Sequence, residues 1–353
     1  MTTLGAMSPR TLLAVDGNSL LHRSFHASAR TGFRTADGRP MWAVRGLLSQ
    51  LSAAVDRVCA DAVVVGFDDP RASVRRERWP SYKAHRDAKP RTLEDQLDAA
   101  VEVLRELGVV VAVPPGLEAD DILASAAAYA RQVGARTVVA TSDRDSFALI
   151  DDSTSMLRIL NGGVDASPLL DPRRLEMVTG VRAEQYLDFA ALRGDTSDNL
   201  PGVPGIGPKT AARLLAEFGS ARTAFDDAAA DGVRCRAVLG AATTRCLAAP
   251  GARRTWELNC AAMAMVTDAP LGLDLDHGVG CLPLREEAVA TVFARLELQV
   301  PSAVRALTGR EPTRPRAGDV DASWRPSTRR SSMRHPRLPR QPTPAAYVQE
   351  TLF

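Results

Sequence analysis

Four short apolar runs constrain the fold of this chain more than any other feature. They lie at Thr11–Val15, Ala62–Phe67, Val109–Val113 and Thr137–Ala140. Each run is continuously apolar rather than alternating, which is typical of strands that helices cover on both faces. Segments with helical spacing separate the runs, at Ala43–Arg57, Thr92–Leu107 and Ala119–Gln132. We therefore expect an α/β domain whose parallel sheet is flanked by helices.

The sequence pattern changes twice after this domain. From about Asp171 the pattern is helical, and beyond Gly309 the composition shifts to Arg, Pro and Ser, with nine arginines against four acids. Such a composition buries too little apolar surface to fold. We expect an α/β domain over residues 1–170, a helical subdomain over 171–308 and a disordered tail over 309–353.

The overall composition fits a soluble globular protein, at 45% hydrophobic and 24% charged residues. No run of eighteen apolar residues and no apolar leader is present, so we expect neither a membrane span nor secretion. The five cysteines form no CxxC pair, which argues against a zinc site and against a disulfide framework. We expect a monomer in the cytoplasm.

Carboxylates follow every one of the apolar runs at its carboxyl end. They are Asp16 after the first run, Asp68 and Asp69 after the second, Glu118, Asp120 and Asp121 after the third, and Asp143 and Asp145 after the fourth. The carboxyl ends of parallel strands share one edge of a sheet, so these groups should converge. Their mutual repulsion requires cations, and oxygen ligands favour Mg²⁺ or Mn²⁺ over zinc. A helix cap explains any single acid equally well, but not four clusters at matching positions.

A further acidic pair precedes a glycine-rich stretch in the helical part. Asp195 and Asp198 are three residues apart, a spacing that places both on one face of a helical turn. The sequence LPGVPGIGPKTA follows, and its three glycines predict a tight hairpin between two helices. Such a backbone can approach a phosphate closely, and Lys209 and Thr210 add a charge and a hydroxyl. The alternative is an ordinary glycine-rich turn.

A strongly basic segment lies between Arg71 and Arg91. It contains eight Lys or Arg residues and two acids, with Trp79 and Tyr82 interleaved. Basic side chains can follow a phosphate backbone while an aromatic ring stacks on an unpaired base. The alternative is a solvated basic surface helix.

Five stretches of the sequence together resemble a known family. They are VDGNSLLHRSFHA, VVVGFDDPRASVRRERWPSYKAHR, PPGLEADDILAS, TSDRDSFALI and GDTSDNLPGVPGIGPKTAARLLAEFG, and the likeness extends over about residues 11–300. In this order they resemble the 5′ nuclease domain of bacterial DNA polymerase I and its stand-alone relatives, the flap endonucleases. The resemblance implies a PIN-like sheet, a helical arch near residues 70–92 and a helix–three-turn–helix element near 195–218.

The resemblance also implies roles for individual residues. The ligands of a first divalent ion would be Asp16, Asp68, Glu118, Asp120 and Asp143, with Asp121 beside them, and those of a second ion Asp145, Asp195 and Asp198. Lys83 and Arg86 match basic residues that orient the scissile phosphate. The expected DNA contacts are Arg75, Arg76 and Tyr82 in the arch and Gly202, Val203, Gly205, Ile206, Gly207, Lys209 and Thr210 in the hairpin. The hairpin would also hold a K⁺ ion.

The function implied is that of a stand-alone bacterial 5′-3′ exonuclease or flap endonuclease. It would act at the nucleoid on 5′ flaps, gaps and nicks in DNA, and on RNA–DNA hybrids, during primer removal and repair. The last five residues, QETLF, resemble a sliding-clamp docking peptide through Gln349, Leu352 and Phe353, although the Arg-rich tail could equally be a non-specific DNA tether. Two alternative functions are a PIN-type ribonuclease and a non-catalytic junction-binding protein. The basic arch and the hairpin argue against the first, and the intact acids argue against the second.

Overall fold

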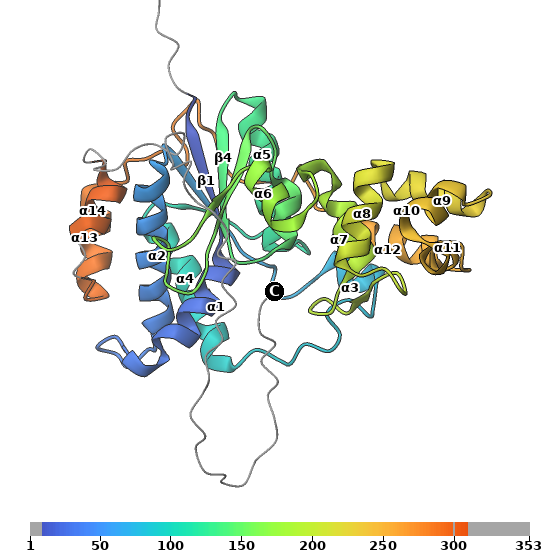
Figure 1. Ribbon diagram of the computed structural model, residues 1–353. Coiled ribbons are helices and arrows are strands. Elements are labelled where there is room, and N and C mark those ends of the chain that lie inside the picture. The colour runs from blue at the N-terminus through green and yellow to red at the C-terminus, as the bar shows by residue number, and fades with distance from the viewer. Residues whose placement is uncertain (1–8, 299–300, 310–353) are drawn as a thin grey trace, which may run out of the picture. The chain divides into compact units, whose positions relative to one another are not determined.

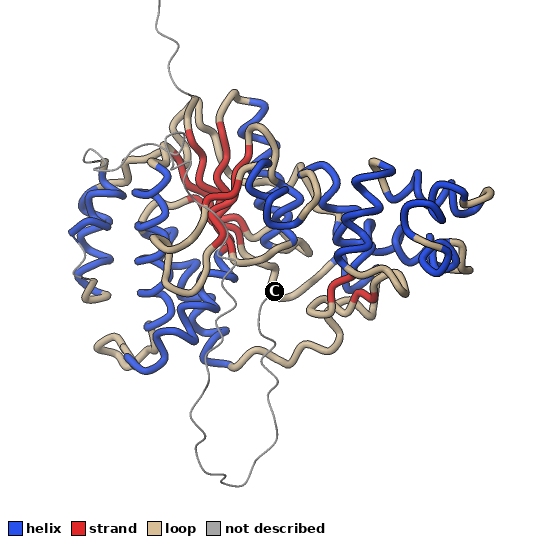
Figure 2. Tube along the Cα trace, viewed as in Figure 1, coloured by secondary structure: helices blue, strands red, loops and turns tan. Residues whose placement is uncertain are grey.

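A six-stranded sheet forms the centre of the α/β part, and the computed structural model describes residues 9–298 and 301–309 of the chain (Figures 1 and 2). The strands are β1 (Thr11–Asp16), β2 (Ala62–Gly66), β3 (Val110–Ala112), β4 (Arg136–Thr141), β5 (Thr154–Arg158) and β6 (Leu169–Leu170). They lie in the order β3-β2-β1-β4-β5-β6, with β1 to β5 parallel and β6 antiparallel to β5. The four predicted strands are confirmed, but the sheet is mixed rather than wholly parallel.

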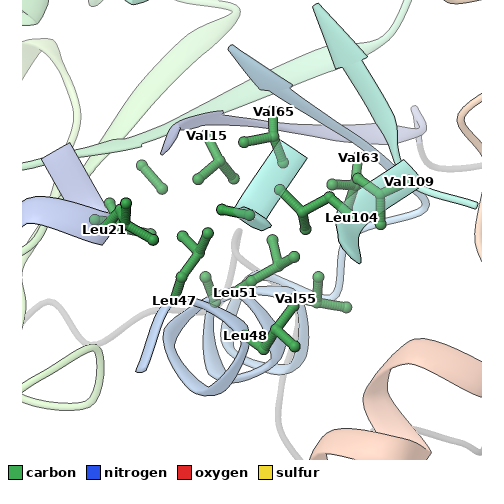
Figure 3. Packing of buried hydrophobic residues seen from close by; sticks show 14 of the residues in the cluster. Val15, Leu21, Leu47, Leu48, Leu51, Val55, Val63, Val65, Leu104 and Val109 are labelled. Atoms are coloured by element: carbon green, nitrogen blue, oxygen red, sulfur yellow. The ribbon is translucent and has the colours of Figure 1, made fainter. Parts of the chain in front are cut away.

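Helices cover both faces of the sheet, because successive residues of each central strand point to opposite sides. Leu13 and Val15 of β1 face a core with α1 (Gly17–Ser28), α2 (Trp42–Val58) and α4 (Arg91–Glu106). Leu12 and Ala14 face the other core, against α5 (Ala119–Gln132). Figure 3 shows Leu47, Leu51 and Val55 of α2 packed beneath Val15, Val63 and Val65 of the strands. The three predicted helices therefore correspond to α2, α4 and α5.

The region after the sheet is helical, as expected. Its helices are α6 (Pro172–Thr179), α7 (Tyr186–Arg193), α8 (Pro208–Phe218), α9 (Ala221–Ala229), α10 (Val233–Leu239), α11 (Ala241–Leu247) and α12 (Ala252–Met263). Two short antiparallel strands, β7 (Gly194–Asp195) and β8 (Leu200–Pro201), connect α7 to the turn that precedes α8. Asp195 and Asp198 therefore lie in a strand and a turn, rather than on a helical turn.

The chain then returns to the α/β part. The backbone N–H of Leu282 donates to the carbonyl of Asp61, and the N–H of Val63 donates to Gly280, next to the start of β2. Two further helices, α13 (Glu286–Arg295) and α14 (Pro301–Thr308), add buried side chains to the core of α2 and α4. The expected helical subdomain of residues 171–308 thus includes a final portion that belongs to the core of the first domain.

No helix in the described part of the chain combines the length and apolarity needed to cross a bilayer. The expected clamp-binding residues Gln349, Leu352 and Phe353 lie outside the described residues, as does the tail after Gly309.

Candidate metal centre

Two carboxylates cross-link the ends of three strands at the edge of the sheet. Asp16, the last residue of β1, accepts hydrogen bonds from the N–H of Ser19 (2.8 Å) and from the hydroxyl of Thr141 at the end of β4 (2.7 Å). Asp68, just beyond β2, accepts from the side-chain amide of Asn18 (2.7 Å) and from the N–H of Ala119 (3.0 Å). The ends of β1, β2 and β4 and the start of α5 therefore meet at one place.

The other acids of this edge are close enough to repel one another. Withdrawal from solvent raises the pKa of Asp120 well above its usual range, and the charges of Asp143 and Asp16 raise it further. Burial also raises the pKa of Asp16 to about 7, together with the charges of Asp68 and Asp143. These mutual effects place four of the predicted ligands in one electrostatic cluster.

The predicted second group of ligands adjoins the first. Burial raises the pKa of Asp145 to about 8, and the charges of Asp143, Asp195 and Asp198 raise it further. The Oδ1 atom of Asp145 is buried and has no hydrogen-bond partner within the described residues. An acceptor without a partner, among carboxylates that repel one another, suits a hard divalent cation.

The carboxylates are not arranged around a common point as they stand. Across residues 9–298 and 301–309, no three His, Cys, Asp or Glu side chains are grouped closely enough to hold a metal ion. Hydroxyls, backbone N–H groups and cationic side chains hold individual acids instead.

Two cationic side chains of the basic segment occupy this edge. Lys83 Nζ lies 3.1 Å from Glu118 Oε2 and 3.9 Å from Asp198 Oδ2, and Arg86 Nη2 lies 2.6 Å from Asp198 Oδ1. Burial acts to lower the pKa of Lys83, but the charges of Glu118 and Asp198 raise it above its ordinary value. The structure thus brings both expected catalytic residues to the expected metal ligands.

The segment expected to form a helical arch is mostly irregular. Between residues 71 and 90 the structure has a single short helix, α3 (Val74–Arg78), followed by turns and an extended run to α4 (Figure 1). Pro80 and Pro90 interrupt helix formation. Tyr82 is buried and its hydroxyl donates to Glu118 Oε2 at 3.0 Å, so its ring cannot stack on a base in this conformation. In this conformation Tyr82 supports Glu118, and its contact with DNA stays a prediction.

Arg75 and Asp121 bind each other instead of their predicted ligands. Arg75 Nη1 and Nη2 each donate to one oxygen of Asp121 at 2.7 Å. The same two oxygens accept from the N–H groups of Glu118 (3.0 Å) and Val266 (2.9 Å). Asp121 is 0% exposed and its carboxylate is saturated, so this conformation leaves it no capacity for a metal ion.

Arg75 also contacts the end of the helical subdomain. Its Nε donates to the carbonyl of Ala262 (3.1 Å) and its Nη2 to that of Ala264 (2.8 Å). Arg75 therefore joins α3, the first turn of α5 and the exit from α12. Its neighbour Arg76 is exposed, and it remains suited to the predicted DNA contact.

Only part of the glycine hairpin is available to a ligand. Val203 and Ile206 are buried, and their N–H groups donate to the carbonyls of Leu192 and Val203 respectively, so their expected contact with DNA stays a prediction. A Cβ on Gly202 would lie 2.1 Å from the carbonyl oxygen of Arg193. Only glycine therefore fits at this position, where the backbone passes close to the end of α7. The exposed members are Gly205, with φ of +79°, Gly207 and Lys209, beside the half-buried Thr210 at the start of α8.

Several supporting residues escaped the sequence analysis. Asn18, Ser19 and Thr141 hold Asp68 and Asp16, and Ser146 donates to Asp120 at 3.2 Å. The only signal in the sequence was their position directly beside the acids. Asp69 accepts from the N–H of Gly116 (2.7 Å) and of Arg71 (2.9 Å), and so shapes the loops.

An α/β sheet with converging carboxylates at its edge, followed by a helical hairpin, defines the class of metal-dependent nucleases with a PIN-like fold. Two family models match consecutive parts of the chain: the 5′-3′ exonuclease N-terminal resolvase-like domain over residues 11–180, and the 5′-3′ exonuclease C-terminal SAM fold over residues 181–277. The chain belongs to the 5′-3′ exonuclease family.

Curated relatives include bacterial DNA polymerases I. The chain is 41% identical to that of Mycobacterium tuberculosis over 217 residues, which cover 62% of this chain and 24% of the relative. It is 32% identical to that of Deinococcus radiodurans over 295 residues, which cover 82% and 28%. The chain thus spans about a quarter of the length of these relatives.

Solved structures share the fold at low sequence identity. A bacteriophage T5 D15 flap endonuclease complex with DNA and metal ions is 21% identical, with a TM-score of 0.54, over 82% of this chain and 100% of that chain. The T5 D15 protein co-crystallised with metal ions has a TM-score of 0.52 at 21% identity, over 72% and 98% of the two chains. The catalytic core of Rad2 in complex with DNA has a TM-score of 0.52 at 14% identity, over 86% and 92%.

Proposed function

We propose that this chain is a structure-specific 5′ nuclease that hydrolyses DNA phosphodiester bonds at 5′ flaps, gaps and nicks with two divalent cations, Mg²⁺ or Mn²⁺. The observation that carries the proposal is the acidic edge, where the ends of β1, β2 and β4 bring Asp16 and Asp68 together and Lys83 and Arg86 reach Glu118 and Asp198. Such a cluster is costly without cations, and its residues have the donor chemistry of a hard ion. Membership of the 5′-3′ exonuclease family supports the polarity of cleavage.

The proposed ligands follow from this edge. One cation would be held by Asp16, Asp68, Glu118, Asp120 and Asp143, and the other by Asp145, Asp195 and Asp198, whereas Asp121 is excluded by its bond to Arg75. When bound, divalent cations lower the pKa of water and stabilise charge on the leaving oxygen. Lys83 and Arg86 would then bind the scissile phosphate and stabilise the negative charge that develops on it. Both side chains already reach this edge through Glu118 and Asp198.

Substrate selection would depend on shape rather than base sequence. The exposed Gly205, Gly207 and Lys209, with Thr210, would bind the duplex backbone, and a K⁺ ion at this hairpin would assist. Arg76 and the rest of the basic segment would contact the unpaired 5′ strand. Because few bases need to be read, an RNA–DNA hybrid is a further proposed substrate, which fits roles in primer removal and repair.

Removal of one central carboxylate tests the proposed reaction. We expect Asp143→Ala to cut a 5′-flap duplex in Mg²⁺ about 1000-fold more slowly than the wild type, because a catalytic metal ion supplies several kcal/mol of transition-state stabilisation. Flap binding should survive. The measurement is single-turnover cleavage, with Asp152→Ala, which removes an exposed carboxylate before the start of β5, as the matched control.

Two other outcomes would contradict the proposal. If the wild type bound flaps, gaps and nicks but cut none of them, the chain would be a junction-binding protein. If it cut single-stranded RNA in preference to every DNA junction, the PIN-type ribonuclease function would replace it.

We also propose that the final QETLF docks on a sliding clamp, because a tethered apolar anchor raises the local concentration of the enzyme at DNA ends. The full chain, but not a chain without its last five residues, should retain a purified bacterial clamp in a pull-down. Equal retention by both would exclude this role for the peptide.

A further inference from the structure

A cationic side chain without a counter-ion lies one strand beyond the acidic edge. Arg158 ends β5 and is paired in register with Thr141 of β4, the residue that holds Asp16. Its guanidinium carbon lies 5.4 Å from the centre of the Phe147 ring. Its Nε is buried, and it finds no hydrogen-bond partner in the part of the chain that the structure describes.

A second arginine follows the strand that pairs with β5, three residues after Thr141, the register partner of Arg158. Arg144 lies between Asp143 and Asp145 in the loop after β4 and is half-buried. Burial lowers the pKa of Arg158, and the positive charge of Arg144 lowers it further. Over residues 9–298 and 301–309, neither arginine side chain forms an ion pair or a hydrogen bond.

Three other arginines around the acidic edge each have an acidic partner. Arg75 binds Asp121, Arg86 binds Asp198, and Arg193 lies 3.9 Å from Asp195. Arg144 and Arg158 therefore differ from their neighbours in having no acid to bind. Two like charges held together and partly withdrawn from water are unfavourable unless an anion binds between them. The planar guanidinium matches the oxygens of a phosphate in particular.

We propose that Arg144 and Arg158 form a subsite for a backbone phosphate of the nucleic-acid substrate, next to the scissile phosphate. The subsite rests on the proposed function: a strand that brought one phosphate to the acids of β1, β2 and β4 and continued past β4 would carry its next phosphate to the end of β5. In the sheet, β5 is the neighbour of β4 on the side away from β2 and β3. Lys83 and Arg86 would hold the strand near Glu118 and Asp198, and the arginine pair would hold it beyond β4.

The variant Arg158→Met distinguishes a role of Arg158 in binding phosphate from a role in stabilising the fold. It keeps an unbranched side chain over Phe147 but removes the charge. We expect the dissociation constant for a 5′-flap DNA duplex, measured in Ca²⁺ at about 0.1 M salt, to rise about tenfold, and the slope of log affinity against log salt to fall by about 0.9. The Tm of the free protein should stay the same or rise, because a poorly solvated charge is lost.

Matched variants complete the experiment. Arg131→Met removes an arginine that is already paired, with Asp151, and should leave both the affinity and the salt slope unchanged. Arg144→Met should weaken binding as Arg158→Met does. A fall in Tm with unchanged affinity for Arg158→Met would overturn the proposal, since the arginine would then be structural.

Inorganic phosphate as a second probe separates this proposal from the proposed function. We expect phosphate to raise the Tm of the wild type more than that of Arg158→Met. If phosphate acts in this way but the wild type neither binds nor cuts flaps, the anion subsite stands and the nuclease proposal fails. If the wild type cuts flaps while Arg158→Met behaves as the wild type in both assays, the nuclease proposal stands and the subsite fails.

Discussion

A chain that ends at His277, where the family match ends, is expected to be unfolded or insoluble. It would lack α13 and α14, whose Val289, Val292, Phe293 and Leu296 are at most 3% exposed in the core of α2 and α4. Each of these side chains contributes about 1.5–3 kcal/mol by burial. Their sum is on the order of the whole stability of a typical domain, about 5–15 kcal/mol.

The soluble fraction on expression and the cooperativity of thermal unfolding by circular dichroism measure this effect. A chain that ends at Gly309 retains both helices and is the matched control. Cooperative melting of the shorter chain within a few degrees of the control would mean that the core does not need α13 and α14.

The adjacent residues Arg75 and Arg76 should give opposite phenotypes. Arg75→Ala leaves the buried carboxylate of Asp121 without its partner, and the loss of one member of a buried ion pair costs about 3–5 kcal/mol. Arg76→Ala removes an exposed side chain and should change the free energy of unfolding by less than about 0.5 kcal/mol. It should instead weaken flap binding and lower the salt slope by about 1.

Urea unfolding and flap-binding titrations at several salt concentrations measure the two phenotypes. A double-mutant cycle with Asp121→Ala should give a coupling energy of about 1–3 kcal/mol, because the two side chains are in direct contact. If Arg75→Ala kept full stability and lost only DNA affinity, Arg75 would be the phosphate contact that its place in a basic segment first indicated.

The parts of the fold that could be predicted are those with a strong local period. β1, β2 and β4 are continuously apolar, and α2, α4 and α5 repeat their apolar residues at helical spacing. β5 was missed because its sequence, TSMLR, has only two consecutive apolar residues, Met156 and Leu157. β6 has only two residues, and its pairing depends on a long-range contact that no local pattern specifies.

The sequence predicted which residues make up the candidate site, but not which of their side chains bind one another. Asp120 and Asp121 are neighbours in the first turn of α5, so both were equally good ligands in the sequence. About 100° of helical rotation separates them, and only Asp121 faces Arg75 and the chain at Val266. The burial of Tyr82 was missed for a similar reason, because an aromatic residue in a basic loop shows its burial only when its tertiary contacts are known.

The return of the chain to the sheet makes the helical subdomain an insertion with two attachments. It leaves the α/β part near Asp171 and rejoins it at Val266, where a backbone N–H donates to Asp121 in α5, the helix that carries Asp120. Two attachments restrict the motion of the subdomain more than one attachment would. They therefore limit how far the spacing between the hairpin and the acidic edge can vary. Such a spacing would measure, in nucleotides, how far from the duplex junction the strand is cut.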